Sequence, residues 1–162
     1  MRTVYPVLAV AAILTIAGCG GSSGGPASTT PEHHYAGATA PSDQAAATAA
    51  ITTTWQTFFH TGTDPKAAAQ LLENGSRLGA AIKVAAKIQR KQKITEDAKV
   101  LGVDFTSPTA ATVTYNLLSH GSVLLPKATG QAVLQDGRWK VSQSTFCTLV
   151  QLGAGGTKIP GC

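Results

Sequence analysis

The chain of 162 residues contains three cysteines, and the surroundings of the first point to a chemical modification. Cys19 closes the stretch Ile16-Ala17-Gly18-Cys19, at the end of a short apolar segment that follows Arg2. A positive start, a short apolar run and small residues at its end are typical of an export signal. Small residues directly before a cysteine are typical of the site where a diacylglyceryl group is attached to the sulfur. We therefore predict that residues 1–18 are removed and that Cys19 becomes a lipidated N-terminus. The alternative is ordinary secretory cleavage.

The two remaining cysteines, Cys147 and Cys162, are predicted to form a disulfide. The prediction follows from the first assignment, because an exported chain occupies a compartment in which disulfides persist. A bond closing a loop of this length contributes about 3 kcal/mol in the chain-entropy model. Neither cysteine has a second Cys or a His nearby at the spacing of metal ligands. The sequence therefore predicts no metal site and no cofactor.

Composition divides the chain into three parts: the signal segment, a linker and a folded domain. Residues 19–41 hold the predicted lipidated cysteine and then a mixture rich in Gly, Ser, Thr, Pro and Ala. Such a composition does not bury enough apolar surface to fold and is typical of a flexible tether. The domain is expected over residues 42–162. The net charge of +5 is a mild excess, short of the dense basic clusters of nucleic-acid-binding proteins, so no nucleic-acid partner is expected.

The first half of the domain has the periodicity of helices. Ser42-Asp43 and then Asp64-Pro65 are start signals, and apolar residues recur at three- and four-residue spacings in the first and third of the predicted helices. The predicted helices cover residues 44–60, 66–73 and 77–92. The third carries four cations on the side opposite its apolar stripe: Lys83, Lys87, Arg90 and Lys91. They form either a solvated face or a surface attracted to anionic lipid headgroups or acidic wall polymers.

After Lys93 the pattern alternates, as expected for half-buried strands. In the first strand, three apolar residues share one face: Leu101, Val103 and Phe105. Asp104 lies on the opposite face. Val113, Tyr115 and Leu117 share a face of the second. Residues 123–134 form a third strand that Pro126 and Gly130 should bend. Asp136-Gly137 predicts a tight hairpin into a fourth strand over residues 138–145, followed by a short terminal segment.

The sequence thus predicts an α+β domain in which three N-terminal helices pack on a curved antiparallel sheet of about four strands. Several motifs resemble those of small actinobacterial lipoproteins related to the mycobacterial low-molecular-weight secreted antigen. They are the Trp-Gln-x-Phe-Phe sequence at 55–59, Asp64-Pro65, the Asp-Gly-x-Trp-Lys-Val hairpin at 136–141 and Thr145-Phe146-Cys147. The resemblance covers about residues 42–152. It implies a nuclear-transport-factor-2-like (cystatin-like) domain, a cone with a cavity between sheet and first helix, and no assigned activity or functional residue.

Three classes of function are consistent with these features. We expect a non-enzymatic module of the cell envelope, held on the extracytoplasmic face of the membrane, that binds a small apolar ligand or a protein partner. Trp55, Tyr115 and Trp139 are expected nearest the ligand, with the Tyr115 hydroxyl as polar group. One alternative is an accessory envelope protein with a filled core. The other is a cavity enzyme of the steroid-isomerase type, but spacing does not bring its candidate groups Asp104, Tyr115 and His120 together. No nucleophile, zinc or phosphate-loop motif is present.

Overall fold

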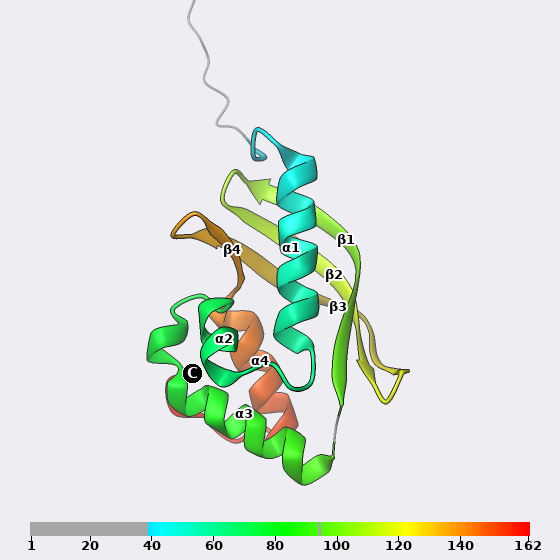
Figure 1. Ribbon diagram of the computed structural model, residues 1–162, viewed down its shortest axis with the longest axis vertical. Coiled ribbons are helices and arrows are strands. Elements are labelled where there is room, and N and C mark those ends of the chain that lie inside the picture. The colour runs from blue at the N-terminus through cyan, green and yellow to red at the C-terminus, as the bar shows by residue number, and fades with distance from the viewer. Residues whose placement is uncertain (1–38, 94) are drawn as a thin grey trace, which may run out of the picture. The chain divides into compact units, whose positions relative to one another are not determined.

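A computed structural model of the protein describes residues 39–93 and 95–162 (Figure 1). The predicted signal segment, the lipidation site at Cys19 and most of the predicted tether lie outside these residues. The described part is an α+β domain with helices before and after a four-stranded antiparallel sheet, whose strands lie side by side in chain order β1-β2-β3-β4. The predicted fold class is confirmed at this level.

Helix α1 (Gln44–Phe59) begins where the sequence placed its start. Asp43 Oδ1 accepts a hydrogen bond of 2.9 Å from the Ala46 amide, which satisfies one of the amides left free at a helix N-terminus. The buried side of α1 comprises Ala47, Ile51, Thr54, Trp55 and Phe59. Their spacing follows the helical repeat, so one side of α1 faces the sheet along most of its length.

Helices α2 (Pro65–Gln70) and α3 (Gly79–Gln92) follow, each slightly shorter than predicted. Between them, residues Gly75–Arg77 form a 3₁₀ turn after Asn74, which is in the left-handed region. Gly75 is required here by close approach, since a Cβ at this position would lie 1.9 Å from the Ala69 carbonyl oxygen. The turn therefore delays the start of α3 relative to the sequence prediction.

The sheet consists of β1 (Glu96–Ser107), β2 (Ala110–Ser119), β3 (Ser122–Gln135) and β4 (Arg138–Val141). In β2, Val113, Tyr115 and Leu117 are buried as predicted. The prediction for Leu101 is wrong, because this side chain is 47% exposed. A register shift between Val100 and Gly102 leaves Leu101 unpaired, and such a bulge reverses the alternation of faces at that point.

The third strand is irregular where the sequence suggested it would be. The pairing of β2 with β3 shifts between Tyr115 and Leu117 and again between Leu117 and Leu118. Pro126, which has no amide proton to donate, falls within this irregular stretch and not in a regular ladder. The irregularity predicted at Pro126 is confirmed, whereas Gly130 pairs with Val113 in a regular stretch of the ladder and does not interrupt it.

The C-terminal region differs from the prediction. Residues Gln143–Gly153 form a fourth helix, α4, and not the end of a strand and a short terminal segment. The Ser142 hydroxyl accepts a hydrogen bond of 3.1 Å from the Thr145 amide. Ser142 is therefore the N-cap of α4, although its position also continues the alternating pattern of the preceding strand. The disulfide between Cys147, within α4, and Cys162 is present, as predicted.

Among the helices of residues 39–93 and 95–162, α1 is the one that lies across the sheet, where it contacts β1 and β4 (Figure 1). The Thr54 hydroxyl donates to the Trp139 carbonyl at 3.0 Å and ties α1 to β4. Helix α3 instead packs on α2 and α4, and these three helices gather near the C-terminal end of α1. The expected packing of all three N-terminal helices on the sheet therefore does not describe α2 and α3.

Candidate ligand pocket

A pocket of about 360 Å³ lies where the C-terminal end of α1 meets α2, α3, α4 and the hairpin of β2 and β3. Its volume falls within the range of about 300–1,000 Å³ typical of small-molecule sites. Most of the side chains that line it are apolar. They include Phe58, Phe59, Pro65, Ala68, Ile82, Ala85, Ala86, Ile88, Leu117, Leu124, Leu125, Phe146, Leu149, Val150 and Leu152.

Two of these lining residues are large exposed hydrophobic side chains. Leu124 on β3 is 50% exposed and Leu152 on α4 is 64% exposed. Leucines of this exposure on separate elements, both belonging to one hollow, are more informative than scattered surface leucines. They give the pocket an apolar border that is accessible to solvent.

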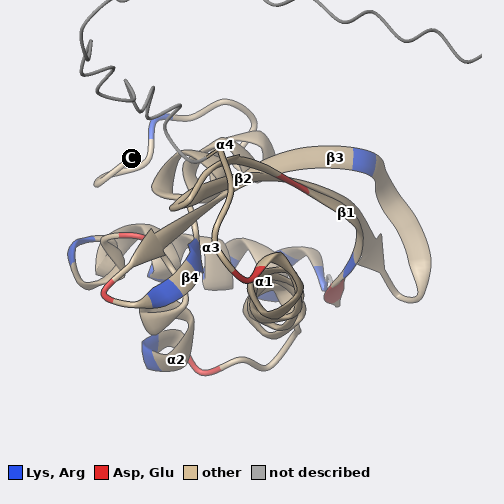
Figure 2. Cartoon of the chain, turned by 90° about the horizontal axis from the view of Figure 1, so that it is seen from above, with Lys and Arg blue, Asp and Glu red and all other residues tan. Residues whose placement is uncertain are grey.

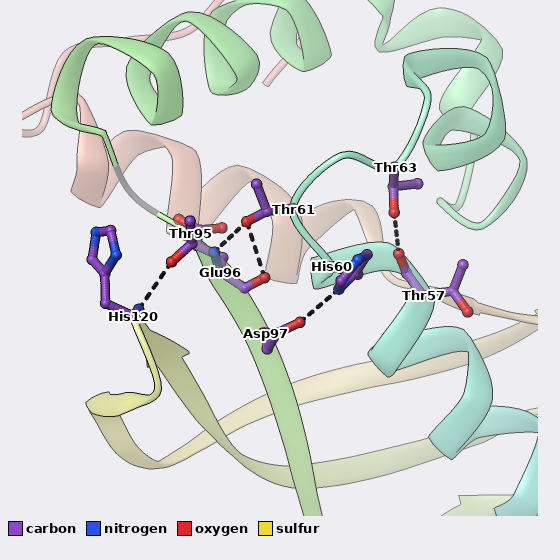
Figure 3. A network of polar contacts seen from close by, with 8 residues as sticks. All are labelled: Thr57, His60, Thr61, Thr63, Thr95, Glu96, Asp97 and His120. Carbon is purple, nitrogen blue, oxygen red and sulfur yellow. Dashed lines mark hydrogen bonds and ion pairs between the residues drawn. The ribbon is translucent and has the colours of Figure 1, made fainter.

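The polar groups of the pocket include a carboxyl, contributed by Glu96 at the start of β1. Its backbone is held by Thr61, in the loop after α1 (Figure 3). The Thr61 amide and hydroxyl donate to the Glu96 carbonyl at 2.9 and 3.2 Å, and the Glu96 amide donates to the Thr61 hydroxyl oxygen. This pair of residues fixes the point at which β1 passes the end of α1.

The Glu96 side chain is held by α3. Gln89 Nε2 donates to Glu96 Oε2 at 2.9 Å. Burial raises the pKa of the Glu96 carboxyl above its ordinary value of 4.5, and the bond from Gln89 opposes part of that effect. Gln89 also lines the pocket, so the two side chains form a polar position within an otherwise mainly apolar wall.

The adjacent residue, Asp97, has a different environment. Its Oδ1 lies 2.8 Å from His60 Nδ1, and both side chains are largely exposed (Figure 3). Successive residues of a strand point to opposite faces, which accounts for the contrast between Glu96 in the pocket and Asp97 outside it. His60 is the residue at the C-terminal cap of α1.

The three residues predicted to lie nearest a ligand are in the core. Trp55, Tyr115 and Trp139 are buried, and none of them is among the residues that line this pocket. Tyr115 lies one layer behind the wall, since its ring stacks on Phe59 with centroids 5.5 Å apart. Burial and the nearby Glu96 carboxylate raise the pKa of Tyr115 to about 12.

The candidate groups of an isomerase-like site are not brought together in the pocket. Asp104 and His120 are exposed and do not line it. His120 Nε2 lies 2.8 Å from the Lys93 carbonyl oxygen, and its amide donates to Thr95, as Figure 3 shows. These contacts give His120 a role in the turn that joins β2 to β3.

Lys83, Lys87, Arg90 and Lys91 are all exposed on α3, as predicted. Figure 2 shows Lys and Arg in small separate groups on several elements, with long uncharged stretches between them. Within residues 39–93 and 95–162, no group of three or more His, Cys, Asp or Glu side chains is arranged to hold a metal ion. In the same residues, no helix has both the length and the apolar character needed to cross a membrane.

Sequence reasoning missed Glu96 and Gln89, although a signal for Glu96 was present. Glu96 has the same parity in its strand as Ala98, which is buried, and Val100, which packs against the core. A carboxyl on the inward face of a strand is unusual and marks a position to consider for function. The contact between Glu96 and Gln89 joins β1 to α3, and the spacing of residues within either element does not predict it.

Comparison with known proteins places this domain in a family of antigens. The family model for the low molecular weight antigen MTB12, C-terminal domain, matches residues 44–157, and the chain belongs to that family. The resemblance to the mycobacterial antigen family is thereby confirmed. Searches among curated proteins and among solved structures found no match.

Proposed function

We propose that this protein is a non-enzymatic module of the cell envelope that binds a small apolar ligand in the pocket beside the end of α1. The observation that carries the proposal is the pocket itself: about 360 Å³, walled mainly by aliphatic and aromatic side chains, with few polar groups. An apolar hollow of this kind with a small number of polar groups is the usual form of a ligand site.

The position of the protein in the envelope is a second part of the proposal. Acylation of Cys19 would anchor the chain to the outer face of the cell membrane, and the residues between Cys19 and α1 would separate the domain from the lipid. Helix α1 lying across the sheet supports a domain of the cystatin-like kind. In the native host, Cys19→Ser should shift the protein out of the membrane fraction. A serine variant that stays in that fraction, with no acyl mass on the wild type, would overturn the anchor.

Nile red binding by the full chain in phospholipid nanodiscs, with empty nanodiscs as blank, tests the pocket. Ala86→Phe fills the pocket from α3, whereas Ala80→Phe makes the same change at an exposed position of α3 that does not line it. We expect roughly tenfold weaker binding for Ala86→Phe, equivalent to about 1.4 kcal/mol, and no change for Ala80→Phe. Equal binding by both variants would contradict the proposal.

A second pair of variants covers the case in which Ala86→Phe disturbs folding. Leu124→Gln alters the border of the pocket, and Leu101→Gln changes a leucine of similar exposure that does not line it. Only the first should weaken dye binding. An absence of dye binding by the wild type would favour the accessory role, with the exposed cations of α3 as the surface for an envelope partner.

A further inference from the structure

The pocket contains a feature that an apolar ligand alone would not use. In a wall made mainly of aliphatic and aromatic groups, the Glu96 carboxyl lies among the lining residues. Its Oε2 accepts from Gln89 Nε2 at 2.9 Å. Within residues 39–93 and 95–162, Oε1 takes part in no hydrogen bond with the protein. Oε1 is not among the fully buried polar atoms without a partner, so water can reach it while the pocket is empty. A ligand that fills the pocket removes Oε1 from water, which costs about 1–3 kcal/mol if no partner replaces the water. A ligand that supplies this partner is therefore favoured over one that does not.

We propose that the ligand is a hydrocarbon chain carrying a hydroxyl group, and that Glu96 binds this hydroxyl through Oε1 while the chain occupies the apolar part of the pocket. This inference rests on the proposed function, since it names the chemical class that the same pocket takes. Glu96 is positioned for the task from both directions: Thr61 fixes its backbone and Gln89 its side chain.

The surroundings of Glu96 distinguish a hydroxyl from other head groups. A hydroxyl both donates and accepts, so it pairs with the carboxyl in either protonation state. A carboxylate head would place two negative groups together in a poorly solvated site, which is unfavourable. An ammonium head would have to leave water for a mainly apolar pocket, at a cost that a half-buried carboxyl only partly offsets.

Displacement of Nile red from the full chain in nanodiscs tests the head group. The competitors are dodecanol, its methyl ether, dodecylamine and tridecanoate, which carry the same dodecyl chain on different head groups. The ether still accepts a hydrogen bond but cannot donate one. We expect dodecanol to bind about five- to tenfold more tightly than the ether, the effect of one hydrogen bond of about 1–1.5 kcal/mol, and more tightly than the two ionic competitors.

Glu96→Gln assigns any preference to this residue. With Gln89 donating to the new amide oxygen, the amide nitrogen of the variant would face the ligand and donate to alcohol and ether alike. The preference for alcohol over ether should therefore fall to about one, while binding of the shared chain persists. Asp97→Asn is the matched control, because it neutralises the next carboxyl along β1, which is exposed and does not line the pocket.

The outcomes separate this inference from the proposed function. Dye binding with equal affinities for alcohol and ether, or a preference that survives in Glu96→Gln, overturns the role of Glu96 and leaves the apolar site standing. If dodecylamine binds more tightly than dodecanol and this preference is lost in Glu96→Gln, the group recognised by Glu96 is a cation and not a hydroxyl. If Nile red does not bind at all, the proposed function fails and this inference fails with it.

Discussion

The two ends of α1 meet different surroundings, although the same helix runs through both. Along most of its length α1 presses Ala47, Ile51 and Trp55 against the sheet, where they are buried in the core. At its C-terminal end Phe58 and Phe59 instead form part of the wall of a hollow. The sheet closes the first region, whereas the second is bordered by four helices and a hairpin that do not fill the space between them.

The difference shows that apolar character in a sequence does not distinguish core from site. Phe59 belongs to both regions: it is buried, stacks on Tyr115 and also lines the pocket. An apolar side chain lines a pocket if open space lies beside it and belongs to the core if other side chains fill that space. Which of the two applies depends on elements distant in the chain. Variants at the two ends of α1 should therefore separate stability from binding.

The largest effect is expected in the closed region. Trp55→Ala removes a fully buried side chain that contacts Phe59 and Tyr115, and such truncations cost about 3–5 kcal/mol of unfolding free energy. Leu152→Ala, at the border of the pocket, should cost less than about 1 kcal/mol because the leucine is already 64% exposed. Denaturant unfolding of both variants gives the comparison, and equal losses would remove the distinction between a filled and an open region.

The disulfide should have the next largest effect, since it holds the C-terminal tail to α4, one wall of the pocket. It joins residues 15 positions apart, and removing a bond over such a loop costs about 3 kcal/mol in the chain-entropy model. The buried Ile159 already docks the tail, so we expect a smaller loss. Denaturant unfolding of a double Cys→Ser variant at 147 and 162 measures it. A loss above the full loop-closure value would mean that α4 itself depends on the bond.

The region between α1 and the sheet was easier to predict from the sequence than the region around the pocket. The start of α1, the buried face of β2 and the hairpin at Asp136-Gly137 depend on local signals, and each lies where the sequence placed it. Helix α4 was missed because its cap, Ser142, continues the alternation of β4. Leu101 was assigned to the wrong face because a bulge leaves no trace in composition.

The sequence predicted an apolar pocket but not its position in the domain. The sequence identified apolar faces on a helix and on strands, and expected a hollow between them near Trp55, Tyr115 and Trp139. Those faces close well enough to bury all three side chains. The hollow lies instead where α2, α3 and α4 meet the end of α1, an arrangement set by contacts between helices far apart in sequence.

A smaller effect is expected from Glu96, and it depends on pH. Because its pKa is raised in the folded state, the folded protein holds this proton more tightly than the unfolded chain does. The resulting stabilisation is fully present below the ordinary value of 4.5 and is lost as the pH rises through the raised value. Glu96→Gln cannot ionise, so its Tm should exceed that of the wild type at neutral pH, and the difference should narrow on acidification.

Thermal unfolding of the wild type and Glu96→Gln across the same pH range tests this expectation. A constant difference for Glu96→Gln across the same pH range would mean that the pocket does not disfavour the charged carboxyl.

The smallest effect is expected from Tyr115→Phe, which removes one hydroxyl from the layer behind the pocket. Tyr115 is buried and does not line the hollow, so dye and dodecanol binding should be unchanged, in contrast to Glu96→Gln. The variant should also lack a phenol that ionises near pH 12 in an alkaline absorbance titration of the wild type, since the pKa of Tyr115 is raised to about 12. The stabilisation linked to that pKa is present below the ordinary value of 10 and is lost as the pH rises through about 12. Weaker binding of the dye or dodecanol by Tyr115→Phe, at unchanged stability, would show that Tyr115 contacts the ligand. The ligand site would then include part of the region between α1 and the sheet.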